Sequence, residues 1–273
     1  MDIVVNQEIG LAPKGARTIP CQCNFYHQLL SSLTDQTHAP PVADLLRRFH
    51  GLEGRWVVAS PIHWQATHND AMIIQSGQTL VLPDAESRLW FDALSAFLAS
   101  ENIHVHYHDA HTWLLQCKDM PHIRAKPVQQ VLHQSMMTEL KGLDETHFWQ
   151  RFMTEIQMFF SAHALNEARL GLNSINGLWI WGDGTLHEKV DIPIYCDEPL
   201  FKLASLLSTQ VNDVKTSTRF AKNGLILYSV LSKQDEQRLQ TRLQNTVTQW
   251  YWNNVAYLSK PKRWWSRLIE RVY

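Results

Sequence analysis

The chain of 273 residues is 45% hydrophobic and 19% charged, a composition typical of a globular protein that can bury a large core. Its 25 Lys and Arg residues nearly balance 26 Asp and Glu residues, so the formal net charge of -1 gives no overall field for nucleic acid or an anionic membrane. The start lacks a signal-peptide pattern and no run of about 18 apolar residues occurs, which predicts a cytoplasmic protein without a membrane span.

The cysteines form no disulfide framework and no CxxC metal pair. Cys21 and Cys23 make an isolated C-x-C, while Cys117 and Cys196 stand alone. We interpret all four as reduced thiols, with a structural or incidental role for the C-x-C pair.

In the first half of the chain, short apolar segments alternate with Gly and Pro breaks. We expect a strand at 3–5, then a loop to residue 20. Helices are expected at 25–33 and 42–49, and strands at 55–64, 71–74 and 79–82, with a proline-bounded turn at the end of the first of these strands. A helix over 85–100 capped by Asp84 and a hairpin over 103–117 that turns near Asp109 should follow.

In the second half, Asp144 is a candidate cap for a helix with Phe148, Phe152, Ile156, Phe159 and His163 on one side. Strands are expected at 178–181, 190–196 and 224–230, with a helix over 198–207. Ser232 and Asp235 resemble a capping box for a helix that repeats Leu239, Leu243, Val247 and Tyr251.

This alternation predicts an α/β fold with a mainly parallel or mixed sheet and helices on both faces. We expect one domain over 1–273, with residues 118–142, which contain a short helix after Pro127, as the place for any subdivision.

Histidines are the main candidates for a metal site. His104 and His106 share one face of a strand, and His63, His68 and Asp70 are further candidates. In a chain with 14 histidines, a structural or solvent-exposed role is the alternative.

The glycine-flanked turn Gly182-Asp183-Gly184 follows an apolar strand, as phosphate-binding loops do. It is too short for a Walker loop or a dinucleotide fingerprint, so a plain turn is the alternative. No G-x-S-x-G motif and no active-site cysteine motif occurs. In open α/β sheets ligands collect beyond the carboxyl ends of strands, here this turn, Cys196-Asp197 and Ser229.

A polar stripe is expected before this turn. On one continuous helix, Glu155 and Asn166 would share a face, with Arg169 one turn further. In a packed arrangement Glu155 or Arg169 must be paired or face a cleft. A helix-to-strand corner fixed by hydrogen bonds is the alternative.

The C-terminal segment interleaves aromatic and basic residues, including Arg263, Trp264, Trp265 and Arg267. This pattern is compatible with stacking on single-stranded nucleic acid or with a membrane interface. A final helix packed through Trp264, Leu268 and Tyr273 is the alternative that we favour.

Three motifs carry a family resemblance: E-I-Q-M from Glu155, N-E-A-R from Asn166, and N-x-L-W-x-W-G-x-G from Asn176 through Trp179 and Trp181 to Gly184. Together they resemble the bacterial regulatory protein RpfE type family. Gly177 stands where that family commonly has serine, and Ser60-Pro61-Ile62-His63-Trp64 with Asp70 resembles its D-P-V-H-L segment.

The W-x-W-G-x-G element is also similar to one in cofactor-independent phosphoglycerate mutases of the alkaline phosphatase superfamily. That resemblance implies two metal ions held by Asp and His clusters and a serine nucleophile. The chain lacks a D-G-x-x-D start and a late D-x-x-G-H segment. Two-metal phosphoryl transfer requires such ligands, so we expect a relative without the full metal site and without mutase activity.

We therefore expect a regulatory protein that binds a ligand or a partner protein, with no cofactor. The competing hypothesis is a divalent-metal phosphomutase or phosphatase that uses His63, Asp70, His104 and His106 with the glycine turn. The candidate binding cleft contains the following residues: Glu155, Asn166, Arg169, Asn176, Trp179, Trp181, Gly182, Asp183, Gly184, His63 and Asp70.

Overall fold

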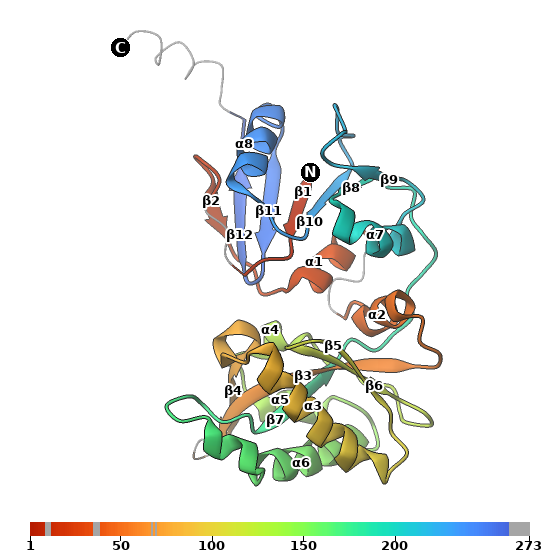
Figure 1. The fold of residues 1–273 in the computed structure, drawn as a ribbon, viewed down its shortest axis with the longest axis vertical. Helices are drawn as coiled ribbons and strands as arrows, with labels where there is room; N and C mark the ends of the chain where they lie inside the picture. Colours follow the sequence, from red (N-terminus) through yellow and green to blue (C-terminus); the bar gives the residue numbers. More distant parts are fainter. Residues whose placement is uncertain (9–11, 35–38, 67, 69, 262–273) are drawn as a thin grey trace. The chain divides into compact units, whose positions relative to one another are not determined.

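The computed structural model describes residues 1–8, 12–34, 39–66, 68 and 70–261 (Figure 1). The chain forms two compact units. Unit 1 combines 1–35 with 188–273, and unit 2 comprises 36–187. The expectation of a single folding domain stays a prediction.

Unit 1 is built on a seven-stranded mixed sheet with the order β2-β12-β11-β1-β10-β8-β9. Its strands are β1 (Asp2–Val5), β2 (Arg17–Ile19), β8 (Ile194–Cys196), β9 (Val211–Asp213), β10 (Leu225–Tyr228), β11 (Thr248–Trp252) and β12 (Val255–Ser259). The five strands from β11 to β9 in this order pair in parallel, whereas β12 pairs antiparallel with both β11 and β2.

Helices cover both faces of this sheet. Ile3 and Val5 of β1 join a core cluster with Leu239 and Leu243 at the end of α8 (Lys233–Arg242), so α8 lies on their face. Val4, whose side chain points to the opposite face, is also buried, and α1 (Phe25–Ser31) contacts β1. α7 (Phe201–Leu207), which follows η3 (Glu198–Leu200), contacts β8 and β9. The predicted α/β class and mixed, mostly parallel sheet are therefore confirmed in this unit.

Unit 2 contains a second sheet that the sequence did not predict. Its strands are β3 (Trp56–Ala66), β4 (Ala71–Ser76), β5 (Val105–Asp109), β6 (Thr112–Gln116) and β7 (Gly177–Trp181). The long strand β3 is central, because β4, β6 and β7 all pair with it, and every pairing in the sheet is antiparallel.

The helices of unit 2 are α2 (Val42–His50), α3 (Asp84–Ala99), α4 (Val128–Val131), α5 (Met136–Lys141), α6 (Phe148–Ser161), and the 3-10 turns η1 (Gly77–Leu80) and η2 (Ala164–Ala168). α3 and α6 pack together through stacked rings: Trp90 on Phe160 at 5.1 Å and Phe97 on Phe159 at 4.3 Å. Asp144 caps α6 as predicted, since its carboxylate accepts the amides of Phe148 and Trp149.

Several predicted elements are wrong. Residues 17–19 form strand β2 instead of loop, and 77–80 form η1 where a strand was expected, because the Ser76 and Thr79 side chains cap this turn. Pro61 lies inside β3, where it pairs with Leu178, so no turn occurs there. Asp84 does not cap α3 but binds Arg88 and Tyr107.

The helix expected from Ser232 to Tyr251 is also shorter than predicted. Ser232 is the N-cap, because its hydroxyl accepts the Asp235 amide, but the predicted capping box is only half formed: the Asp235 carboxylate accepts from the Ser232 hydroxyl instead of the Ser232 amide. α8 nevertheless ends at Arg242, and Tyr251 lies in strand β11 beside β1. Within the described residues, no helix is both long and apolar enough to cross a membrane.

Candidate functional site

Most residues of the predicted binding cleft lie on strand β7 or directly beside it in the chain. All five of its residues are buried, and the two indoles on it have structural partners. Trp179 Nε1 donates to the Lys126 carbonyl at 2.8 Å, and Trp181 Nε1 donates to Ser60 Oγ at 3.1 Å. Both tryptophans are therefore core residues that hold β7 against β3 and the segment before α4.

The turn after β7 requires glycine. Gly182 has φ of +77° and Gly184 has φ of +138°, conformations that L side chains rarely adopt. A Cβ atom on Gly182 would lie 3.2 Å from Val58 Cγ2 of β3. The Gly182 carbonyl accepts the Ala43 amide in the first turn of α2, so the turn is docked onto that helix.

Asp183 is the centre of a hydrogen-bond network in this turn. Its Oδ2 accepts from Arg55 Nη1 at 3.1 Å, from His122 Nδ1 at 3.0 Å and from the Ile123 amide at 3.0 Å. Its Oδ1 accepts from the Gly184 amide at 2.9 Å. The carboxylate thus ties β7 to the start of β3 and to the loop after β6.

A cleft of about 210 Å³ opens beside this network. It is lined by Asp44, Arg47, Gly54, Arg55, Trp56, His122, Asp183, Gly184 and Thr185, and we call it the glycine-turn cleft. Asp44 of α2 anchors its second side, accepting from Arg47 Nε at 2.7 Å and from the Leu186 amide at 2.9 Å.

The carboxylates of the cleft are less exposed than its arginine and histidine side chains. The Asp183 and Asp44 side chains are 3% and 12% exposed, whereas Arg47 and Arg55 are 24% exposed and His122 is 78% exposed. Arg47 donates from Nε to Asp44 and from Nη1 to the Leu52 carbonyl, and its Nη2 has no hydrogen-bond partner among the described residues. The open face of the cleft therefore presents donors and positive charge.

The opposite end of β7 is closed. The Asn176 side chain pairs with the backbone of Trp64 like a strand residue, accepting its amide at 2.8 Å and donating to its carbonyl at 2.7 Å. His63 Nδ1 lies 2.8 Å from the Ser174 carbonyl. The Asn176 side chain and His63 Nδ1 are therefore both engaged with neighbouring backbone.

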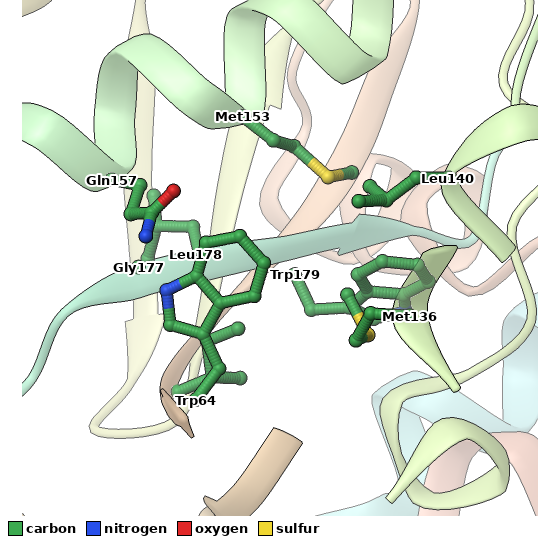
Figure 2. A pocket seen from close by; sticks show the side chains of 9 residues that line it. Trp64, Met136, Leu140, Met153, Gln157, Gly177, Leu178 and Trp179 are labelled. Atoms are coloured by element: carbon green, nitrogen blue, oxygen red, sulfur yellow. The ribbon is translucent and has the colours of Figure 1, made fainter. Parts of the chain in front are cut away.

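Figure 2 shows the small apolar pocket beside this closed end, between β7 and the helices α5 and α6. Its lining includes Trp64, Met136, Met153, Gln157 and Trp179. Its volume of about 10 Å³ is close to that of a single water probe. The pocket is a packing gap too small for a metabolite.

The predicted polar stripe does not form, because α6 ends at Ser161 and η2 follows with a different geometry. Asn166 donates to the Phe160 and Ile175 carbonyls and accepts the Ile175 amide. Arg169 is buried and binds Glu86 Oε1 at 2.5 Å and the Leu80 carbonyl at 2.7 Å. These contacts fit the alternative of a corner fixed by hydrogen bonds.

Glu155 lies apart from this corner. It is exposed on α6 and lines a separate cleft of about 490 Å³, together with residues at the end of α3 and Lys118. Asp70 stands before β4, where hydrogen bonds from Ser135 and the Ala71 amide lower the pKa of its carboxyl.

The histidines of β5 belong to a cluster that the sequence did not reveal. The His106 ring lies 4.4 Å from that of His50 on α2, and His50 Nε2 lies 2.8 Å from His108 Nδ1. Burial lowers the pKa of His106, and burial with the neighbouring His106 lowers that of His108 to about 4. His104 is exposed, and His68 lies in the loop before β4. Across the described part of the chain, no group of three or more His, Cys, Asp or Glu side chains is arranged to hold a metal ion.

At the carboxyl edge of the parallel sheet in unit 1, Asp197 follows β8 and Ser229 follows β10. The Asp197 carboxylate accepts both the amide and the hydroxyl of Ser229. Asp197 and Ser229 therefore bind each other. The basic and aromatic residues Arg263, Trp264, Trp265 and Arg267, like Leu268 and Tyr273, lie outside the described residues.

No family model matches the chain, and no curated protein matches it. Among solved structures, it is similar to a cofactor-independent phosphoglycerate mutase from Thermoplasma acidophilum DSM 1728. The two share 13% sequence identity with a TM-score of 0.35, over 96% of this chain and 89% of that one. This distant similarity names no family for the chain, and the RpfE-type resemblance stays a prediction.

The residues of the predicted binding cleft thus lie in several places within unit 2. Of them, Asp183 and Gly184 line the glycine-turn cleft, with Gly182 beside them, while Glu155 lines another cleft and His63 and Asn176 lie at the closed end of β7. Sequence reasoning missed Arg47, Arg55 and His122. For Arg55, the one hint in the sequence is its position immediately before a buried strand.

Proposed function

We propose that the chain is a cytoplasmic regulatory protein of the RpfE type, distantly related to phosphoglycerate mutases but without mutase activity. Its ligand is a small anion of the phosphorylated-metabolite class, bound in the glycine-turn cleft. The observation that carries the proposal is the arrangement of charge there: two covered carboxylates behind two arginines and an exposed histidine.

The chemistry of these groups suits a phosphate or carboxylate. Arginine donates in a fixed fork that matches such oxygens, and its charge does not depend on pH in the physiological range. Asp44 and Asp183 hold Arg47 and Arg55 in place before any ligand arrives, which reduces the entropy lost on binding. The Thr185 side chain lines the same cleft.

A pair of arginines on α2 provides a matched test. Arg47 and Arg48 both bind the Asp44 carboxylate, but Arg47 lines the cleft and Arg48 donates instead to the Leu186 carbonyl. We expect calorimetry to detect binding of 3-phosphoglycerate or inorganic phosphate, and Arg47→Ala to weaken it at least about ten-fold, the effect of one lost charged contact.

Arg48→Ala should lose a similar amount of stability and keep the affinity. If both variants bind as the wild type does, or if no phosphorylated ligand raises the melting temperature, the glycine-turn cleft is not an anion site. Equal losses in both variants would point to disruption of α2 instead of a lost ligand contact.

One contact favours a second candidate function, a phosphatase or phosphomutase. Asp183 holds Nδ1 of His122 while most of the ring is exposed, an arrangement that suits a general acid or base. Turnover of p-nitrophenyl phosphate or phosphoglycerate, assayed with and without added divalent metal and lost in His122→Ala, would favour this enzyme over the binding protein.

A further inference from the structure

The segment between β2 and α1 places two thiols in contact. Cys21 Sγ and Cys23 Sγ are 2.8 Å apart and share a hydrogen bond. Cys21 is partly exposed, whereas Cys23 is buried. The two sulfurs face each other, and oxidation to a disulfide would remove both S–H hydrogens and shorten the sulfur–sulfur distance to about 2.0 Å.

The backbone at Cys23 and just after it is held by unit 1. The Cys23 carbonyl accepts the amide of Asn254, at the turn between β11 and β12. Asn24, the next residue, caps α1 by accepting the His27 amide. The backbone of Cys23 is thus held by a helix start and a hairpin, which helps to position a reactive pair.

A hydrogen-bond chain leads from Cys23 into the unit. Cys23 Sγ lies 3.4 Å from Gln28 Oε1, Gln28 Nε2 donates to Ser32 Oγ at 3.1 Å, and Ser32 donates to Asp2 Oδ2 at 2.9 Å. The single S–H of Cys23 donates either to Gln28 or to Cys21 at one time. Cys23 therefore has a polar partner besides Cys21, which orients its sulfur in the buried position.

The two sulfurs differ in acidity. The hydrogen bond from Cys23 lowers the pKa of the Cys21 thiol. The same hydrogen bond, burial and the charge of Cys21 raise that of Cys23. Burial raises the pKa of Cys117 and of Cys196 to about 12. Because the thiolate is the nucleophile, Cys21 is the reactive thiol among the four.

We propose that Cys21 and Cys23 form a thiol–disulfide exchange site for small-molecule disulfides, with Cys21 as the attacking sulfur and Cys23 as the resolving sulfur. The site is independent of the glycine-turn cleft. Partial exposure of Cys21 admits the disulfide, and the sulfur contact places the second thiol for the second step.

The exchange balances in two steps. The Cys21 thiolate attacks one sulfur of the disulfide RSSR, forms a mixed disulfide and releases RS⁻, which takes up a proton. In the mixed disulfide Cys21 carries no charge, so its charge no longer raises the pKa of Cys23. Cys23 then loses its proton to solvent and attacks Cys21 Sγ, which releases the second thiolate. In sum, a protein dithiol and RSSR give a protein disulfide and two RSH.

Equilibration of the reduced full-length protein with mixtures of glutathione and glutathione disulfide tests this site, with alkylation and peptide mapping by mass spectrometry. We expect an internal disulfide between Cys21 and Cys23. Cys23→Ser should accumulate a glutathione adduct on Cys21, and Cys21→Ser should carry little adduct. Iodoacetamide should modify Cys21 at least about ten-fold faster than Cys117 in native protein at neutral pH.

Cys117→Ser is the matched control and should form the same disulfide as the wild type. Circular dichroism shows whether each variant is folded, and the wild-type measurement stands without them. The proposal is overturned if no Cys21–Cys23 disulfide forms at any glutathione ratio, or if native Cys21 is alkylated no faster than Cys117.

Discussion

The two ends of strand β7 carry similar sequence signals and have opposite structures. At one end, Asn176 and His63 bond to neighbouring backbone, and the adjoining pocket has room for about one water. At the other end, Asp183 holds Arg55 and His122 beside a cleft of about 210 Å³. Polar residues next to a buried strand therefore do not by themselves indicate a binding site.

The difference lies in what each polar side chain uses as a partner. Asn176 replaces strand hydrogen bonds, so its donors and acceptors are consumed by the sheet. Asp183 binds the Arg55 guanidinium and the His122 imidazole from two other segments, and both side chains are more exposed than the carboxylate. Under our proposal, a ligand would bind at the second end.

The largest expected effect is a difference in how much the polar side chain at each end of β7 contributes to the free energy of unfolding. Asp183→Asn places an amide donor among Arg55, His122 and two backbone amides and leaves Arg55 without its ion pair. We expect a loss of about 3 kcal/mol in the free energy of unfolding. Asn176→Ala removes two hydrogen bonds to Trp64 and should cost about 1–2 kcal/mol, both measured by urea denaturation. A loss in Asp183→Asn no larger than that in Asn176→Ala would contradict the central role of Asp183.

The sequence predicts β7 and its glycine turn because both depend on local features: a run of buried apolar residues and two positions with positive φ. It does not predict the cleft, since Arg47, Arg55 and His122 come from three separate segments that only the fold brings to Asp183. The helix stripe through Glu155 and Asn166 fails for a related reason. Asn166 gains more by bonding the Phe160 and Ile175 backbone than by continuing the helix.

A prediction of intermediate size concerns the loss of stability at acidic pH. It tests the histidine cluster around His108, which lies away from both ends of β7. The His108 side chain is only 12% exposed, and this burial together with the neighbouring His106 lowers its pKa to about 4, below the value of about 6.5 expected in the unfolded chain. Between these values the unfolded state binds more protons, so stability is lost as pH falls from 6.5 toward 4. His108 alone should account for a loss of about 2 kcal/mol between pH 7 and pH 5.

The groups around His108 are His50, His106 and Asp109, whose Oδ2 lies 3.7 Å away. Burial raises the pKa of Asp109. Protonation of Asp109 as pH falls therefore favours the folded state, which is opposite in sign to the effect of His108. The difference between wild type and His108→Gln therefore isolates the histidine: the variant should lose less stability on acidification. His122→Gln, at the open end of β7, is the exposed control. An unchanged acid response in His108→Gln would show that another group carries it.

The smallest effects come from the glycines at the two ends of β7, which should respond to alanine with opposite signs. A Cβ on Gly177 would lie 3.5 Å from Trp64 Nε1, an ordinary contact at negative φ, so Gly177→Ala should stabilise by about 0.4–1 kcal/mol through the unfolded chain. Gly182→Ala meets Val58 at 3.2 Å with φ of +77° and should destabilise by about 1–2 kcal/mol. Thermal unfolding of both variants measures this sign directly. Stabilisation by Gly182→Ala would mean that the turn beside Asp183 is free to change its backbone, and the cleft would then not be built before its ligand binds.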